Sequence, residues 1–258
     1  MGFMLGKGPA KIEPPFNPTT KTGKRLMIED YLVARELSVA DACDWSGGIT
    51  SPGMHLNDQI GCCVLAGSVN AVQSTTKCSG GIERTIPDDY VKTAYELLGN
   101  YVPGDANTDN GLVGVDFLNW WRANTLNGSI LDAYADPLLG SEDADQFKIS
   151  IQEFGGVFTG VQLKQGDMDA FAASRAWAPG SNDGSVVGGH WLWCCAFNAQ
   201  GPVFQTWDKD QQATWEWLFY RQDELHTPLM PDWINKDGMS PAGIDVAGLH
   251  RGLEIVTA

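Results

Sequence analysis

One cysteine and one histidine, far apart in the chain, constrain this sequence more than any other pair of residues. Cys63 follows a turn-like segment, 57–62, and begins a small apolar stretch without proline that suits a helix. His190 follows a Gly-Gly pair and enters an apolar segment typical of a strand, and Gln205 and Trp207 come after it. A cysteine at a helix start, a distant histidine and then an amide form the order expected of a cysteine–histidine–amide nucleophile site.

The roles expected of these residues come from the chemistry of thiols. The thiolate is the nucleophile, and the first turn of a helix and a nearby imidazole both favour it. Cys63 is therefore expected to attack, with His190 as base and then acid. Gln205 is expected to hold the imidazole and Trp207 to shield it from water, although tryptophan there is by default a core residue. Cys62 is the rival nucleophile, and a buried structural cysteine is the competing interpretation.

The turn before Cys63 offers donors for a developing oxyanion. Asn57 or Gln59 could donate a side-chain N–H, although residues of this kind in a turn more often cap the local backbone. His55 lies near the turn and could line a cleft. A metal site is not expected, because adjacent Cys-Cys pairs do not give the Cys-x₂-Cys spacing of structural zinc sites. No phosphate-binding or dinucleotide glycine motif is present, so no cofactor is expected.

Apolar patterning predicts helices in the first half of the chain and strands in the second. Helices are expected at 63–77, 87–98 and 114–123, and a shorter one near 168–174. Strands are expected at 148–152 and 156–163, followed by an antiparallel meander at 188–198, 202–207 and 214–220. This order predicts an α+β fold, with the nucleophile helix packed against an antiparallel sheet. One domain would span 27–258, with a helical half to about 145, a β half at about 146–235 and a C-terminal extension, 236–258.

Charge and composition limit the partners. The net charge is −15, and such an acidic chain is a poor ligand for nucleic acid or anionic lipid. Residues 1–26 form an expected extended basic arm, which could dock on an acidic neighbour or another copy of the chain. No signal peptide and no stretch of ~18 apolar residues is found. The six cysteines are therefore expected as free thiols in a reducing cytoplasm.

Several strings resemble the papain-like cysteine peptidases. They are Gly61-Cys62-Cys63 followed by Ala66, then Gly189-His190, then Gln205-Thr206-Trp207. Cys63 is preferred over Cys62 because the second position after glycine carries the nucleophile in that superfamily. Between about residues 30 and 235 the chain looks similar to an uncharacterised papain-like group of bacteriophage genomes. The matching strings are Asp44-Trp45-Ser46, Asn57-Asp58-x-x-Gly61-x-Cys63, Thr108-Asp109-x-Gly111, Phe154-Gly155-Gly156-Val157, and Thr206-Trp207 with Thr214-Trp215.

The supporting positions depart from the superfamily pattern. Asn57 replaces the glutamine six residues before Cys63, Gln205 stands at the asparagine position, and Asp208 replaces a glycine. Trp191 follows His190 where a smaller residue is usual, and is expected to narrow the cleft. The resemblance implies a cysteine hydrolase of peptide or related amide bonds, acting on a peptide or protein substrate. The alternative is a weakened or inactive member that decorates or joins parts of a phage capsid or tail.

Overall fold

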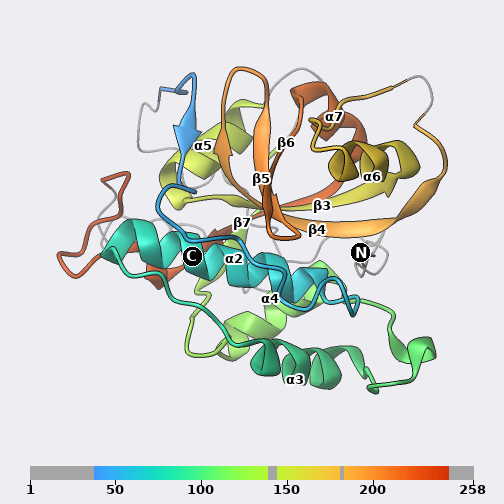
Figure 1. Ribbon diagram of the computed structural model, residues 1–258. Coiled ribbons are helices and arrows are strands. Elements are labelled where there is room, and N and C mark those ends of the chain that lie inside the picture. The colour runs from blue at the N-terminus through green and yellow to red at the C-terminus, as the bar shows by residue number, and fades with distance from the viewer. Residues whose placement is uncertain (1–37, 139–143, 181–182, 244–258) are drawn as a thin grey trace, which may run out of the picture.

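The computed structural model describes residues 38–138, 144–180 and 183–243. The predicted arm, 1–26, lies outside the described residues, as do most of 27–40 and the C-terminal extension after residue 243. The described chain has a central sheet with helices on both faces (Figure 1). Helices α2, α3 and α4 lie on one face, and α5, α6 and α7 lie on the other.

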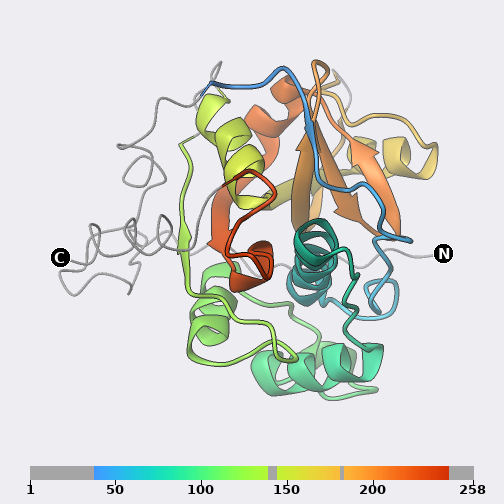
Figure 2. The same cartoon turned by 90° about the vertical axis from the view of Figure 1, so that its left-hand side faces the viewer.

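The helices are mainly short, and one long helix crosses the middle of the molecule. That helix is α2 (Cys63–Gly80), seen nearly end-on in Figure 2. The others are α3 (Asp88–Gly99), α4 (Gly114–Ala123), α5 (Asp145–Phe154), α6 (Gln165–Ala172) and α7 (Trp215–Arg221). The described residues also form two 3₁₀ turns, η1 (Ala106–Thr108) and η2 (Pro231–Trp233).

The sheet is antiparallel throughout the described pairs. Its strands are β1 (Cys43–Asp44), β2 (Ala133–Ala135), β3 (Val157–Lys164), β4 (Val186–Phe197), β5 (Pro202–Thr206), β6 (Lys209–Gln212) and β7 (Gln222–Leu229). Their order is β2-β7-β3-β4-β5-β6, and β1 also pairs with β4. The predicted α+β architecture, a helical half packed on an antiparallel sheet, is confirmed.

Local sequence explains where α2 starts and stops. Gly61 forms a tight turn in which the Cys62 N–H donates to the Ile60 carbonyl at 2.8 Å. The Cys62 carbonyl then accepts the first helical hydrogen bond, from the Ala66 N–H at 3.0 Å. Gly81 ends the helix in the left-handed region, φ 72°, which glycine adopts without steric cost. The first 13 residues of α2 are buried, because the sheet covers one side of the helix and η2 and α3 pack on it as well.

Two of the predicted strands are helices. Segment 148–152 lies inside α5, where Phe147, Ile151 and Phe154 recur at helical spacing and form one buried face. Segment 214–220 is mostly α7, because the Thr214 hydroxyl caps the helix by accepting from the Trp217 N–H at 3.1 Å. The third strand of the meander is instead β6, which pairs with β5. Short apolar runs rich in aromatic residues do not distinguish a buried strand from a buried helix.

Candidate active site

The predicted nucleophile, Cys63, is the first residue of α2 and is buried. Three contacts show that α2 and β4 run in the same direction. An added Cβ at Gly67 would lie 2.9 Å from the Trp191 ring, and Trp193 Nε1 donates to Ser74 Oγ at 2.8 Å. At the far end of α2, the Cys78 thiol donates to the backbone of Trp45, a residue that itself binds the β4 backbone. Cys63, one turn before Gly67, therefore lies at the His190 end of β4.

His190 is fixed by two neighbours. Its Nε2 shares a hydrogen bond of 2.7 Å with Thr206 Oγ1, and its ring stacks on Trp207 with centroids 4.1 Å apart and planes 15° apart. Burial lowers the pKa of His190 to about 3, so the imidazole is neutral. Among the described residues, none makes a hydrogen bond to Nδ1. A neutral ring held at Nε2 leaves Nδ1 as the nitrogen that could take a proton.

Thr206, rather than Gln205, makes the contact to the imidazole. The cause is the register of β4 and β5, in which Gln205 lies opposite Trp193. Side chains alternate along a strand, so Gln205 shares the α2 face with Trp193, whereas Thr206 and His190 point to the other face. Gln205 is buried on the α2 side, and its backbone carbonyl accepts from Asn70 of α2 at 3.4 Å.

The turn before Cys63 uses most of its polar groups internally. Asn57 Nδ2 donates to the Ile60 carbonyl at 3.3 Å, which is local capping, although the amide has a second N–H. Gln59 is exposed. The Gly61 N–H donates to both carboxylate oxygens of Asp109, at 2.9 and 3.1 Å. Asp109 was not among the residues assigned a role from the sequence, although it lies in one of the resemblance strings.

The neighbouring thiol, Cys62, is poorly suited to act as a nucleophile. Its Sγ donates to the His55 carbonyl at 3.2 Å, and burial raises its pKa well above the usual range. His55 contacts the backbone of its own turn and a side chain of α2. Its Nε2 is 2.6 Å from the Pro52 carbonyl and 3.1 Å from Asn70 Oδ1. His55 therefore ties the turn to α2.

A second buried histidine lies behind Trp191 and was missed from the sequence. His226, on β7, stacks against the Trp191 ring with centroids 5.8 Å apart. Its Nδ1 is 2.5 Å from Asp136 Oδ1 and its Nε2 is 3.4 Å from Glu224 Oε2. Burial alone would lower the pKa of His226, but the charge and hydrogen bond of Asp136, and then Glu224, raise it to about 9. His226 is thus a buried cation, unlike His190.

Trp191 fills the space between the sheet and the helices. Its ring lies on Gly67 of α2 and Gly114 of α4, both of which lack a side chain at the point of contact. An added Cβ at Gly114 would overlap the ring. The expected narrowing of a cleft by Trp191 stays a prediction, because these contacts are to the protein interior.

Other site types find little support in the described ranges. No group of three or more His, Cys, Asp or Glu side chains is arranged to hold a metal there. No helix of those ranges is both long enough and apolar enough to cross a bilayer. The six cysteines are thiols, with no disulfide between them.

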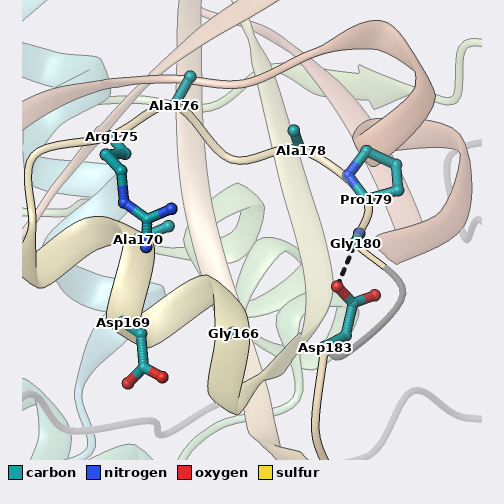
Figure 3. Close-up of a pocket in the computed structure, with 9 residues that line it drawn as sticks. All are labelled: Gly166, Asp169, Ala170, Arg175, Ala176, Ala178, Pro179, Gly180 and Asp183. Carbon is teal, nitrogen blue, oxygen red and sulfur yellow. Dashed lines mark hydrogen bonds between the residues drawn. The ribbon is translucent and has the colours of Figure 1, made fainter.

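A hollow of about 460 Å³ lies beside α6, on the sheet face opposite α2 (Figure 3). None of the residues that line it is a predicted site residue. One of its two carboxylates, Asp183, accepts from the Gly180 N–H at 2.8 Å and is 2.5 Å from Arg221 Nη2. Lys164 Nζ is 3.7 Å from the same carboxylate. Asp183 is therefore engaged in ion pairs that join α7 and β3 to this loop.

Solved structures with a similar fold are cysteine proteases. Xylellain, a cysteine protease from Xylella fastidiosa, matches with a TM-score of 0.62 and 12% identity, covering 88% of this chain and 96% of its own. The proform of the ragweed pollen allergen Amb a 11, a cysteine protease, gives 0.50 and 14%, covering 78% and 70%. Procathepsin B S9 from Trypanosoma congolense gives 0.52 and 13%, covering 87% and 86%. No protein-family model and no curated sequence matches the chain. The chain thus has the papain-like cysteine protease fold.

Proposed function

We propose that this protein is a cysteine hydrolase that cleaves peptide or related amide bonds, with Cys63 as nucleophile and His190 as its base. The observation that carries the proposal is that Cys63 begins the buried helix α2, which packs on β4, the strand that carries the fixed, neutral His190. The papain-like fold supports the same chemistry, but fold alone does not establish activity, so the proposal rests on the site residues.

In the proposed reaction His190 Nδ1 takes the Cys63 proton, and the sulfur attacks the substrate carbonyl carbon. The carbonyl oxygen becomes an oxyanion, for which the Cys63 N–H and the second N–H of Asn57 are the proposed donors. Return of the proton from His190 to the amine releases the first product. Water, deprotonated by His190, then cleaves the thioester and regenerates the thiol. Thr206 holds the ring and Trp207 covers it during these steps.

A second candidate is a weakly active or inactive protein that serves as a phage capsid or tail component. Two observations favour it. The His190 side chain points to the sheet face opposite α2, the helix that carries Cys63. Cys63 is 0% and His190 1% exposed, whereas a substrate must reach both. The low pKa of His190 also opposes a stable thiolate–imidazolium pair. Phage origin, virion partners and a host-cytoplasmic location remain predictions from the sequence resemblance.

The test is the rate at which iodoacetamide alkylates each cysteine between pH 5 and 10, read by peptide mass spectrometry. Cys63 should react faster at pH 6 than the equally buried Cys62, and His190→Ala should remove that advantage. Cys62 is the matched internal control, because it is adjacent, buried and bonded to the His55 carbonyl. Its alkylation should be slow in both proteins.

Hydrolysis is then measured on a fluorogenic peptide library with Cys63→Ala and Cys62→Ala as a matched pair. Cys63→Ala should reduce cleavage to background and Cys62→Ala should retain it. Equal cleavage by wild type and Cys63→Ala would refute the assignment. A wild-type Cys63 that alkylates as slowly as Cys62 would favour the structural candidate.

A further inference from the structure

The Gly61 turn is held from outside by a carboxylate of a distant loop. Asp109 follows η1 and accepts from the Gly61 N–H through both oxygens, at 2.9 and 3.1 Å. Gly61 lies two residues before Cys63. A charge-assisted hydrogen bond of this kind is stronger than one between neutral groups, so it fixes the direction of the peptide that leads into the nucleophile.

The Asp109 carboxylate is itself held in place. The hydroxyl of Tyr95, on α3, donates to Asp109 Oδ1 at 2.5 Å, and the Gly111 N–H donates to the same hydroxyl at 2.9 Å. Tyr95 is buried, and burial together with the hydrogen bond to Asp109 raises its pKa, so it remains a donor. A chain of hydrogen bonds therefore runs from the Gly111 backbone through Tyr95 and Asp109 to the Gly61 amide.

The amides on either side of Gly61, from Gln59 to Cys62, are bonded within the turn. The Gln59 and Ile60 N–H groups donate to the Leu56 carbonyl, at 2.9 and 3.0 Å, and the Cys62 N–H donates to the Ile60 carbonyl. Gly61 is the one residue of this run whose N–H leaves the turn to reach another element. Because Gly61 lacks a side chain to hold it by packing, the Asp109 contact is the external constraint on its peptide.

We propose that Asp109, oriented by Tyr95, is a positioning residue that sets the Gly61 turn and thereby aims the Cys63 thiol and N–H. The inference rests on the proposed function, since it assigns a role in the same reaction. It requires no contact between Asp109 and substrate. The loop that carries Thr108-Asp109-x-Gly111 would then position the active-site turn, in addition to joining α3 to α4.

The test compares Asp109→Ala and Tyr95→Phe with the matched control Asp105→Asn. Asp105 is an acid of the same loop, but its carboxylate caps η1 by accepting from the Asn107 N–H at 3.1 Å. The first readout is hydrogen exchange of the Gly61 amide. The second is the ratio of Cys63 alkylation by iodoacetamide at pH 6 to that at pH 9.5. The third is kcat and KM on the peptide identified by library cleavage.

Asp109→Ala should accelerate Gly61 exchange, lower the alkylation ratio and reduce kcat about tenfold at unchanged KM. A displacement of a few tenths of an ångström is enough, since about 1 Å costs about 100-fold. Tyr95→Phe, which keeps the carboxylate and the ring, should give smaller changes in the same direction, and Asp105→Asn should match wild type. If Asp109→Ala does not fold by circular dichroism, Tyr95→Phe alone decides.

If Gly61 exchange, the alkylation ratio and kcat in the folded variants equal those of wild type, the inference is overturned and the proposed function is left intact. A role in loop stability alone would lower the melting temperature without changing the alkylation ratio, and that result would also overturn it. If Cys63→Ala retains cleavage, the proposed function itself fails, and the inference fails with it.

Discussion

The buried His226 should make the stability of this protein fall as the pH rises above neutrality. His226 is 3% exposed and lies between Asp136 and Glu224, which raise its pKa to about 9 from an ordinary value of 6.5. The folded chain therefore binds this proton more tightly than the unfolded chain does. Its contribution is complete below pH 6.5 and is lost as the pH rises through about 9.

The magnitude follows from the difference in proton affinity. One pKa unit corresponds to about 1.4 kcal/mol, so the step from 6.5 to about 9 corresponds to about 3 kcal/mol of unfolding free energy. The groups around the ring support this sign. Two carboxylates face it, the Tyr134 ring meets it edge-on at 5.4 Å, and the Trp191 ring stacks on it. No second cation appears among its described contacts.

The assay is urea unfolding at pH 6.5, 7.5, 8.5 and 9.5 for wild type and His226→Gln. The pH dependence of wild type must be compared with that of His226→Gln, because buried thiols also make the folded protein less stable above about pH 8.5. Cys194 is one such thiol, since burial raises its pKa. Wild type should lose about 3 kcal/mol more than His226→Gln over this range. If His226→Gln does not fold, Asp136→Asn serves instead, since it removes the carboxylate that retains the proton. Parallel pH dependences would refute the reasoning.

Two further predictions concern the residues around Trp191 and His190. Gly114→Ala should destabilise the fold by about 1–3 kcal/mol, because the new Cβ overlaps the Trp191 ring. Gly128→Ala is the control for backbone strain alone. No atom lies within 4 Å of its added Cβ, but its φ is 83°. Equal melting temperatures for the two variants would contradict the packing argument. Thr206→Val keeps the shape but removes the hydroxyl that holds His190 Nε2, so kcat should fall about tenfold and the pH profile should shift, whereas Thr206→Ser should restore both. A wild-type pH profile in Thr206→Val would show that the hydroxyl does not tune the ring.

Much of the architecture could be read from local sequence. The start of α2 at Cys63 follows from the Gly61 turn and the apolar run after it, and β4 around His190 follows from its glycines and alternating aromatic residues. Each of these two signals comes from residues within about ten positions of each other in the sequence. The predictions made from them are correct because tertiary packing favours the same helix and strand. The predictions of strands at 148–152 and 214–220 were wrong, because short aromatic runs satisfy both helical and strand patterns.

The partners of the site residues depended on the tertiary structure. Gln205 and Thr206 are neighbours in sequence, but pairing of Gln205 with Trp193 puts them on opposite faces, and a shift of one residue would exchange them. Asp109 reaches Gly61 across 48 residues, and His226 meets Asp136 across 90. The sequence by itself determined which residues begin the helix and the strand of the candidate site. Strand register and long-range contacts decided which side chains hold them, because a local pattern carries no information about the facing residue.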